Sequence, residues 1–350
     1  MEDLLSRTRL QEILSRSSDR KIGVIGDLAL DAYWYADMTR SFLSRETPRF
    51  PRPIVREVFS PGAGANVAHN LAALGVGQVV VFSVVGEDWR RDILTDVLTS
   101  LGIEAGHLIA SSQRSTVTYV KPILQGYDSW QEDSRLDFES DQPLAPALED
   151  ALIDMIRQRL PELDALLIAD QLEINGIITD RVRGALNDLA AHYADRWFVV
   201  DSRQRIGLFR NMILKPNWRE ALRAVYPDRS DRALPHDELA RIGQTLADRA
   251  GRPVFVTLSE EGLMICAEGT HRHLPAAPVQ PPLDPVGAGD AFAAALAVSL
   301  TAGATPWEAG TVANLAAAVV VEKLNQTGTA SPDEILTRYD LARQERQHHA

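Results

Sequence analysis

The sequence has few of the features that mark several large classes of protein. Only one of its 350 residues, Cys266, is a cysteine, so no disulfide can form within the chain. Its net charge of −12 and the lack of a basic run argue against a nucleic-acid binder or a protein held on an anionic membrane. No apolar run reaches about 18 residues, the length that a transmembrane helix needs. Residues 1–20 are polar and unlike a leader, so we expect a cytoplasmic protein.

Several catalytic motifs are also missing. No Gly-Lys-Ser or Gly-Lys-Thr is present, which excludes a Walker A loop, and the His-Arg-Asp and Asp-Phe-Gly motifs of protein kinases are absent. The eight histidines form no metal-ligand pattern. What the chain does have is a hydrophobic content of 45%, which supports a large core, and strands that alternate with helices. This alternation predicts an α/β fold with a mostly parallel central sheet and crossover helices.

The most informative stretch is a glycine turn at residues 284–292, Asp-Pro-Val-Gly-Ala-Gly-Asp-Ala-Phe. Gly287, Ala288 and Gly289 precede an apolar helical run, and the free N–H groups of a helix N-terminus favour an anion. An acid, Asp290, follows the glycines. A carboxylate beside a phosphoryl group can take the proton of an attacking hydroxyl. Because Asp is also a favoured helix N-cap, the local pattern leaves both roles open.

Two other stretches contain candidate site residues. Residues 60–75 are glycine-rich and then small and apolar at helical spacing, with Asn66 near the start of the expected helix. Residues 21–27 predict a short buried strand that ends at Asp27, and Asp31 follows shortly after. Residues just past the carboxyl end of a strand line the ligand crevice of an open α/β sheet. Both acids are therefore candidates, with loop or capping roles as the alternative.

Together these stretches resemble the two signatures of the ribokinase-like (PfkB) carbohydrate kinases, over about residues 21–335. The resemblance implies a three-layer α/β sandwich with a small β-sheet lid, and ATP and Mg²⁺ as cofactors. It makes Asp290 the catalytic base and the Gly287–Gly289 turn, with Ala288, the anion hole. This chain departs from the family at Pro285, where Thr is usual, and at Ala63, which stands where the second glycine usually is.

The resemblance also implies residues that contact the substrate and the nucleotide. The expected substrate contacts are Asp31, Gly62, Ala63, Asn66 and Arg135. Asn66 would meet a sugar hydroxyl, because an amide both donates and accepts hydrogen bonds; for Arg135 a surface charge is the alternative. The expected nucleotide contacts are Asn217, Glu220, Thr257, Ser259, Gly262 and Asn314.

Two kinds of cation belong to the same expectation. Asn217 and Glu220 would hold Mg²⁺ through water, since Mg²⁺ keeps several waters and needs few direct ligands. The same pair can equally form a helix capping box, and both roles can hold together. Asp284 would lie near a monovalent cation, usually potassium in this family.

A closer resemblance, to one branch of the family, narrows the class of sugar expected as the acceptor. Residues 26–34, 62–75 and 135–139 are most similar to the heptose-phosphate kinase branch of the family, which implies a phosphorylated sugar attacked at its anomeric hydroxyl. Taken together, Arg40, Arg45, Arg49 and Arg52 would form a basic lid that meets that phosphate, while for each arginine singly a solvated loop face is the favoured alternative. That branch usually has a lysine after the acid at Asp170, and Pro-Lys-Gly where this chain has Ser202-Arg203-Gln204. An unphosphorylated sugar therefore remains the alternative acceptor.

The expected organisation is one kinase domain over residues 21–340, after a helical extension at residues 1–20 and before a polar tail at residues 341–350. His348 and His349 in that tail are either a tag remnant or ordinary tail residues. Residues 33–58, as short exposed strands and loops, and residues 116–138 would form the lid, through which we expect a homodimer. A nucleoside kinase of the same fold and a non-catalytic sugar- or nucleotide-binding regulator are the alternatives. The acid at position 290 disfavours the regulator, because binding alone needs no base.

Overall fold

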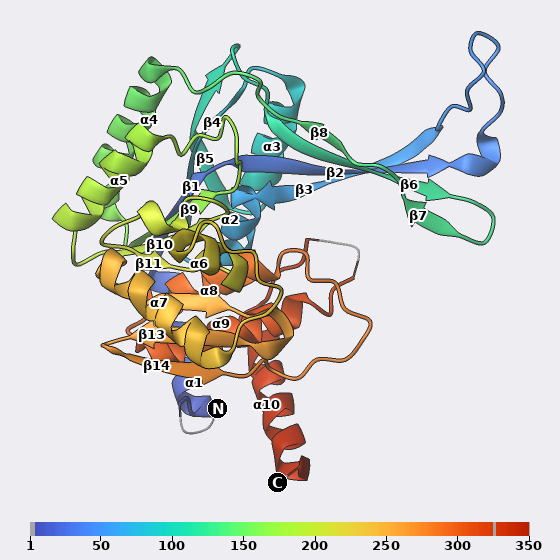
Figure 1. Ribbon diagram of the computed structural model, residues 1–350. Coiled ribbons are helices and arrows are strands. Elements are labelled where there is room, and N and C mark those ends of the chain that lie inside the picture. Colours follow the sequence, from blue (N-terminus) through green and yellow to red (C-terminus); the bar gives the residue numbers. More distant parts are fainter. Residues whose placement is uncertain (1–3, 325–326, 350) are drawn as a thin grey trace.

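The computed structural model describes residues 4–324 and 327–349 (Figure 1). Within this part of the chain the main sheet has nine strands, in the order β14-β13-β12-β11-β10-β9-β1-β4-β5. Their bounds are Lys21–Gly26 (β1), Gln78–Gly86 (β4), Ile103–Ser111 (β5), Ala165–Asp170 (β9), Trp197–Ser202 (β10), Ile213–Leu214 (β11), Val254–Thr257 (β12), Leu263–Ala267 (β13) and Thr270–Leu274 (β14). The neighbours from β12 to β5 pair in parallel, while β13 pairs antiparallel with β12 and with β14. The expected mostly parallel sheet is confirmed.

Two apolar cores lie on the two faces of this sheet, because its central strands are apolar along their length and bury both sides. In β9, Leu167 belongs to one core and its neighbours Leu166 and Ile168 to the other. The first core is covered by α1 (Arg7–Ser15), α2 (Gly64–Ala73), α3 (Trp89–Ser100), α8 (Ala288–Thr301), α9 (Pro306–Val320) and α10 (Pro332–His349). The second is covered by α4 (Pro146–Arg159), α5 (Asp180–His192), α6 (Trp218–Val225) and α7 (His236–Ala250). The result is the expected three-layer sandwich.

A second, smaller sheet projects from the sandwich on the right of Figure 1. It consists of β2 (Leu28–Asp37), β3 (Ile54–Ala63), β6 (Val117–Gln125), β7 (Trp130–Glu132) and β8 (Leu136–Phe138), in the order β3-β2-β6-β7 with β8 also paired to β6. The strands β2 and β3 have ten residues each and pair from Leu28 and Ala63 outward. Short exposed strands were therefore the wrong expectation for residues 33–58, since alternation broken by prolines masked two long strands.

The four arginines expected in a basic lid lie on the connection between β2 and β3. Residues 38–53 form the loop at the far tip of the second sheet, and these arginines are exposed. Arg52 forms an ion pair with Asp133, so its charge already has a partner. The loop that carries these arginines lies away from the sandwich in Figure 1, so other residues form the wall of the crevice.

The two ends of the chain meet on one side of the sandwich. Arg7 of α1 forms an ion pair with Asp340 of α10 at 2.9 Å, and the hydroxyl of Tyr339 donates to the carbonyl of Leu5 at 2.8 Å. Residues 341–349, which we expected to form a tail, continue helix α10 instead. The side chains of His348 and His349, and residue 350 itself, lie outside the described residues. None of the helices that the structure describes is long and apolar enough to cross a membrane.

Candidate active site

Polar residues gather where neighbouring parallel strands end at the same edge of the main sheet. Asp170 closes β9, Asp201 lies near the end of β10, and Lys215 directly follows β11. Asp27 follows β1, and Thr257 closes β12. Because these five strands are neighbours in the sheet, their carboxyl ends place the five side chains along one crevice.

The glycine turn leads into helix α8 at this edge. Gly287 is the N-cap residue with φ of 83°, a left-handed conformation that glycine adopts without a steric penalty. The N–H of Ala291 donates to the carbonyl of Gly287 at 3.0 Å, so Asp290 lies inside the first helical turn. Asp290 is therefore not the N-cap, and the capping alternative for this acid is wrong.

The carboxylate of Asp290 meets a residue from the other glycine-rich stretch. The side-chain amide of Asn66, on the fully buried start of α2, donates from Nδ2 to Oδ2 of Asp290 at 2.7 Å. Asn70 in turn donates to the carbonyl of Asn66 at 3.0 Å and holds that residue from one turn below. The two stretches singled out in the sequence thus converge on one carboxylate. The amide that we expected on a sugar hydroxyl has one of its donors occupied by Asp290.

The surroundings of Asp290 favour its protonated form. Burial raises the pKa of Asp290 to about 7, and the carboxylates of Asp201 and Asp31 act in the same direction. The hydrogen bond from Asn66 and the charge of Lys215 lower it, but they are outweighed. A carboxylate with a pKa near neutrality is matched to taking a proton from a hydroxyl and releasing it afterwards.

Lys215 and Asp201 are residues that the sequence interpretation missed. Lys215 is 4% exposed, and its Nζ lies 3.0 Å from Oδ2 of Asp201. A signal was available, since both residues come at or just past the carboxyl ends of strands, as Asp27 does. The two belong to elements that the sequence separates, and their pairing depends on strand order in the sheet.

Asn217 and Glu220 form the capping box that the sequence allowed. Asn217 Oδ1 accepts the N–H of Glu220 at 2.9 Å, and Glu220 Oε2 accepts the N–H of Asn217 at 2.8 Å, which starts helix α6. Burial and the charge of Asp201 raise the pKa of Glu220, against the opposing effect of Lys215. Oxygen donors of this kind suit Mg²⁺ held through water. The described residues contain no cluster of three or more His, Cys, Asp or Glu with the arrangement of a direct metal site.

The residues expected near the nucleotide line the edge beside β12. The N–H of Thr257 donates to the carbonyl of Pro216 at 2.9 Å and so ties β12 to the start of α6. Ser259 has φ of 55° and Gly262 has φ of 93°, and a side chain at residue 262 would lie 2.1 Å from the carbonyl oxygen of Leu274. The side chain of Asn314 donates to the carbonyl of Pro275 at 2.9 Å. Gly262 and Asn314 therefore stabilise this wall of the crevice.

Asp31 lies in a second cluster, between the small sheet and the sandwich. Its Oδ2 is 2.9 Å from Nζ of Lys121 on β6 and accepts the hydroxyl of Thr327 at 3.0 Å. Lys121 also donates to the hydroxyl of Tyr33 at 3.1 Å. A Cβ at Gly62 would lie 2.4 Å from Oδ1 of Asp31, which explains the glycine there. Lys121 is a further residue that the sequence interpretation missed.

A cavity of about 250 Å³ opens beside this cluster. Tyr33, Tyr35, Lys121 and Trp130 line it from the small sheet, and Asp284 lines it from the glycine turn. Oδ1 of Asp284 accepts the N–H of Val286 at 3.0 Å, which holds the entry to the turn. The cavity therefore joins the Asp31 cluster to the turn that carries Asp290.

Ala63 and Arg135 complete the expected substrate wall. Ala63 precedes α2 with φ of 48°, a conformation that L side chains rarely adopt. Arg135 Nε lies 2.6 Å from Oδ1 of Asp137, and its guanidinium stacks over the ring of Tyr119 at 4.7 Å. The side chain of Arg135 is half exposed and its charge is already paired.

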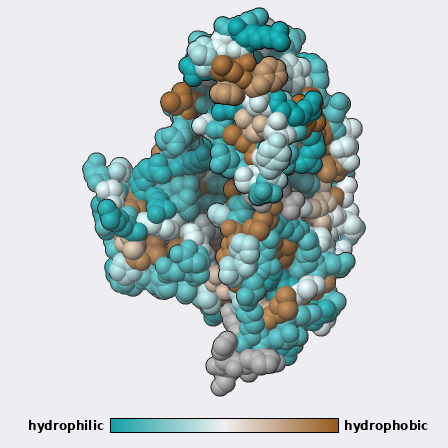
Figure 2. All heavy atoms as spheres, turned by 90° about the vertical axis from the view of Figure 1, so that its right-hand side faces the viewer, coloured by the Kyte–Doolittle hydropathy of each residue, from teal (hydrophilic) through white to brown (hydrophobic). Residues whose placement is uncertain are grey.

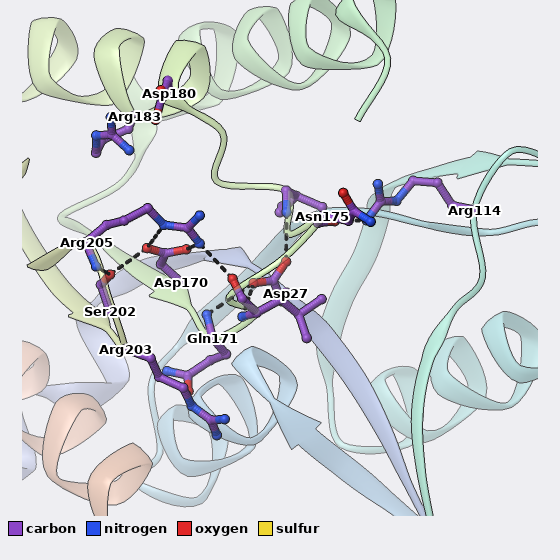
Figure 3. A network of polar contacts seen from close by, with 12 residues as sticks. Asp27, Arg114, Asp170, Gln171, Asn175, Asp180, Arg183, Ser202, Arg203 and Arg205 are labelled. Carbon is purple, nitrogen blue, oxygen red and sulfur yellow. Dashed lines mark hydrogen bonds and ion pairs between the residues drawn. The ribbon is translucent and has the colours of Figure 1, made fainter. Parts of the chain in front are cut away.

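The other end of the crevice holds a dense polar network (Figure 3). Asp27 accepts the backbone N–H groups of Gln171, Leu172 and Ile177 at 3.1, 2.9 and 2.8 Å. Burial nevertheless raises the pKa of Asp27 to about 6. With its oxygens occupied by the backbone, Asp27 anchors the loop after β9.

In the same network Asp170 is paired with Arg205, which contacts both carboxylate oxygens and the carbonyl of Leu172. Arg203 donates from Nε to Oε1 of Gln171 at 3.0 Å, and its guanidinium points away from Asp170 in Figure 3. Arg203 and Arg135 both lie near enough to Tyr119 to oppose the effect of burial on the pKa of that phenol. Arg203 and Arg205 thus both belong to this wall of the crevice.

Comparisons with known proteins find a family model, curated relatives and solved structures that are similar to this chain. Residues 208–334 match a family model described as pfkB family carbohydrate kinase. The bifunctional protein HldE of Trichlorobacter lovleyi is 31% identical over 340 residues, which cover 96% of this chain and 66% of that protein. HldE of Nitrobacter winogradskyi is 34% identical over 335 residues, covering 93% of this chain and 64% of that protein. The chain therefore spans slightly less than two thirds of the length of these relatives.

Solved structures share the fold at lower identity. A ribokinase from Thermotoga maritima superposes with a TM-score of 0.65 at 21% identity and covers 92% of this chain and 99% of its own. Phosphofructokinase-2 from Escherichia coli, solved with potassium, gives a TM-score of 0.68 at 17% identity, with the same coverage of 92% and 99%. At such identities the likeness extends to the architecture.

Proposed function

The chain belongs to the PfkB family of carbohydrate kinases, ATP-dependent enzymes that phosphorylate sugars, and from that premise we propose that it phosphorylates a hydroxyl of a sugar phosphate. Asp290 is the proposed general base and residues 287–290 the proposed anion hole. The observation that carries the proposal is the hydrogen bond from Asn66 to Asp290 beside the N-terminus of α8. It supplies one carboxylate, held in a fixed orientation, next to a concentration of free N–H groups.

In the proposed reaction the acceptor hydroxyl attacks the γ-phosphorus of ATP in line with the leaving ADP. Asp290 takes the hydroxyl proton, and Asn66 keeps the carboxylate oriented toward it. The N–H groups at the start of α8 stabilise the negative charge on the phosphoryl oxygens. Mg²⁺, held through water by Asn217 and Glu220, would neutralise the phosphates of the nucleotide. A monovalent cation such as potassium would lie near Asp284.

The acceptor fits the cavity between the small sheet and the glycine turn. Asp31 and Lys121, an ion pair at 2.9 Å, present a hydrogen-bond acceptor and a donor to sugar hydroxyls. Arg203 is the proposed partner of the acceptor's phosphate, because its guanidinium contacts an amide and, among the described residues, no carboxylate. Arg205 forms an ion pair with Asp170 and therefore stabilises the wall of the crevice. The HldE relatives support a heptose phosphate, attacked at the anomeric hydroxyl, as the first acceptor to test.

The small sheet also supports the proposal of a homodimer. Its outward residues and the loop at its tip expose large apolar side chains: Phe42, Leu43, Phe50, Ile54, Val55, Val58, Tyr127, Trp130 and Leu136. On the side of the molecule shown in Figure 2, hydrophilic residues predominate and apolar residues form separate groups. Pairing of two small sheets would cover the apolar side chains and the strand edges. A monomer in light scattering at micromolar concentration would rule out this assembly.

The test is an ADP-release assay on matched pairs of free sugars and sugar phosphates, including heptose and heptose 7-phosphate, with nucleosides as a third group. We expect the sugar phosphates to be phosphorylated with the highest kcat/KM. Faster turnover of free sugars would leave a sugar kinase but reject the phosphorylated acceptor. Preference for nucleosides would indicate a nucleoside kinase. The absence of turnover with any acceptor would indicate a non-catalytic regulator.

The same assay tests the base. Asp290→Asn keeps the size of the side chain but removes its basicity, so kcat should fall at least about 10²-fold with little change in ADP affinity. Asp154→Asn, at an exposed position on α4, is the matched control and should behave as the wild type. Near-normal turnover of Asp290→Asn would reject the assignment.

A further inference from the structure

Gln171 and Arg203 form a pair of side chains in the wall of the crevice. Strands β9 and β10 run in parallel with Ser202 in register with Asp170, so the next residue of each strand, Gln171 or Arg203, lies beside the other just past the sheet edge. Nε of Arg203 donates to Oε1 of Gln171 at 3.0 Å. Figure 3 shows the two side chains meeting on the side away from Asp170.

The surrounding structure fixes this pair. The N–H of Gln171 donates to Oδ2 of Asp27 at 3.1 Å, and the N–H of Arg203 donates to the carbonyl of Asp170 at 3.2 Å. Gln171 is 9% exposed, so its side chain is held by packing, whereas Arg203 is exposed. A long exposed side chain has many rotamers, and the contact with Oε1 restricts them. Gln171 therefore orients the guanidinium of Arg203.

The pair leaves several hydrogen-bond donors unused. Among the hydrogen bonds of the described residues, Gln171 donates none from Nε2, and Arg203 donates none from its two Nη groups. Nε2 of Gln171 is not sealed inside the protein either, although the residue is more than nine-tenths buried. The two carboxylates of this network, Asp27 and Asp170, are already engaged by backbone N–H groups and by Arg205. An oriented amide and an unpaired guanidinium side by side suit an anion with several oxygens.

The pair lies next to the face of the small sheet that carries Asp31. Leu172, the neighbour of Gln171, packs with Ala29 of β2 and Val117 of β6. Residues two apart in a strand point to the same face, so Ala29 and Asp31 share one face of β2. The loop that begins at Gln171 therefore meets the wall of the acceptor site, at the end of the crevice opposite to Asp290.

We propose that Gln171 is a specificity-determining residue that selects acceptors with a phosphate group remote from the hydroxyl that reacts. Its Oε1 holds the guanidinium of Arg203 toward the crevice, and its Nε2 donates to the same phosphate. A phosphate accepts from both groups at once, whereas a single hydroxyl in its place cannot. The inference rests on the proposed function for the place of the acceptor and for Arg203 as the partner of its phosphate.

The first experiment measures binding of the acceptor without turnover. Kd for heptose 7-phosphate and for heptose is measured by calorimetry in the absence of nucleotide, for the wild type, Gln171→Met and Gln171→Glu. The first variant removes both the acceptor and the donor, and the second keeps an acceptor for Arg203 but replaces the donor by a carboxylate oxygen. Kd for the sugar phosphate should rise about tenfold in Gln171→Met and further in Gln171→Glu, while Kd for heptose changes less than about twofold.

The matched control is Gln204→Glu, which adds the same charge at an exposed position next to Arg203. It should change Kd for the sugar phosphate less than about threefold, because solvent and salt screen a charge that makes no contact. An equal rise in Gln204→Glu and Gln171→Glu would reject the contact. An equal rise for both sugars would also reject it, since it would show a change in the shape of the wall.

The second experiment separates orientation of Arg203 from packing. In the ADP-release assay with heptose 7-phosphate, Gln171→Met should raise KM about tenfold and leave kcat near the wild-type value, because Asp290 and the glycine turn are untouched. In the background of Arg203→Ala the same change should raise KM less, since part of its effect passes through Arg203. Full additivity of the two substitutions would reject the positioning role.

The inference and the proposed function can fail separately. If Arg203→Ala abolishes the preference for the sugar phosphate and both Gln171 variants keep it, this inference is wrong and the proposed function stands. If the wild type has no preference for the sugar phosphate, both this inference and the phosphorylated acceptor are wrong, and a sugar kinase remains.

Discussion

Two groups of acids lie along the same sheet edge, and they differ in what occupies their oxygens. Asp27 accepts three backbone N–H groups, and Asp170 is held by Arg205 and by the hydroxyl of Ser202. Among the hydrogen bonds of the described residues, Asp290 accepts one, from Asn66. An acid with most of its lone pairs engaged stabilises a loop, whereas an acid with most of them left can accept a substrate proton.

The comparison assigns each acid a different sensitivity. Removing a hydrogen-bond partner of Asp27 or Asp170 should lower mainly the stability of the protein, and changes at Asp290 should lower mainly its turnover. Both acids have raised pKa values, about 6 for Asp27 and about 7 for Asp290, so the direction of the shift alone does not separate them. The hydrogen-bond partners do.

The largest effect is expected at the turn itself. Gly289→Val places a branched side chain where the backbone would meet phosphate, and a Cβ there is in ordinary contact with Lys215 at 3.7 Å. Turnover should fall at least about 10²-fold while the melting temperature stays near the wild-type value. Loss of the folded state would show instead that Gly289 serves packing.

At the other end, Arg205→Ala should unfold the protein more easily without a specific effect on chemistry. It leaves the buried carboxylate of Asp170 without its ion-pair partner, which costs about 3 kcal/mol of unfolding free energy. Urea denaturation measures this loss. Arg241→Ala, at an exposed position on α7, is the control, and an equal stability of the two variants would contradict the contrast between the two ends.

The pH profile should follow Asp290. With a pKa of about 7, the base is increasingly protonated below neutrality, so kcat/KM should fall about tenfold per pH unit on the acid side. The limb would be measured from pH 5 to 8 in the ADP-release assay. A plateau that extends down to pH 5 would mean that another group is the base.

The raised pKa of Asp290 also makes the stability of the folded state depend on pH. From its ordinary value of 3.8 up to about 7, the folded state binds the proton of Asp290 more tightly than the unfolded state does. The stability contributed by this group is therefore lost as the pH rises through that window. Asp290→Asn cannot ionise, so relative to the wild type it should gain stability from pH 4 to pH 8 in thermal unfolding. An unchanged difference between the two proteins across this window would count against the raised pKa.

A smaller effect is expected for the acceptor wall. Arg203→Ala removes a guanidinium that pairs with an amide, so the free energy of unfolding should change little. KM for a sugar phosphate should rise about tenfold while KM for the matching free sugar stays constant. Equal changes for both substrates would remove Arg203 from phosphate recognition.

The smallest effect concerns backbone strain before α2. Ala63 has φ of 48°, which a glycine adopts more easily, so Ala63→Gly should add about 1 kcal/mol to the free energy of unfolding. Ala65→Gly, inside α2 and without positive φ, is the control and should destabilise the protein. If Ala63→Gly also destabilises, the conformation at residue 63 is not strained.

Some features of this protein were readable along the chain because they depend on neighbouring residues. Strand and helix alternation predicted the sandwich, and the two glycine turns predicted a helix after each of them; the structure has these helices beginning at Gly64 and Ala288. The capping box at Asn217 could also be predicted from the sequence, because its two members are three residues apart. The two ten-residue strands of the small sheet were missed, because their pairing with each other and with β6 replaces any strong local pattern.

The tertiary structure determined the roles of the acids. Local sequence placed Asp27, Asp31 and Asp290 in turns, and it allowed each of them to cap, anchor or react. The partner of Asp290 is 224 residues away, and that of Lys215 lies on a neighbouring strand. Whether a carboxylate is left with a free lone pair depends on which distant donors the packing brings to it. The sequence by itself therefore indicated the acids and the glycine turns at the ends of strands, and only the fold decided which side chains meet in the crevice and which of them remain able to react.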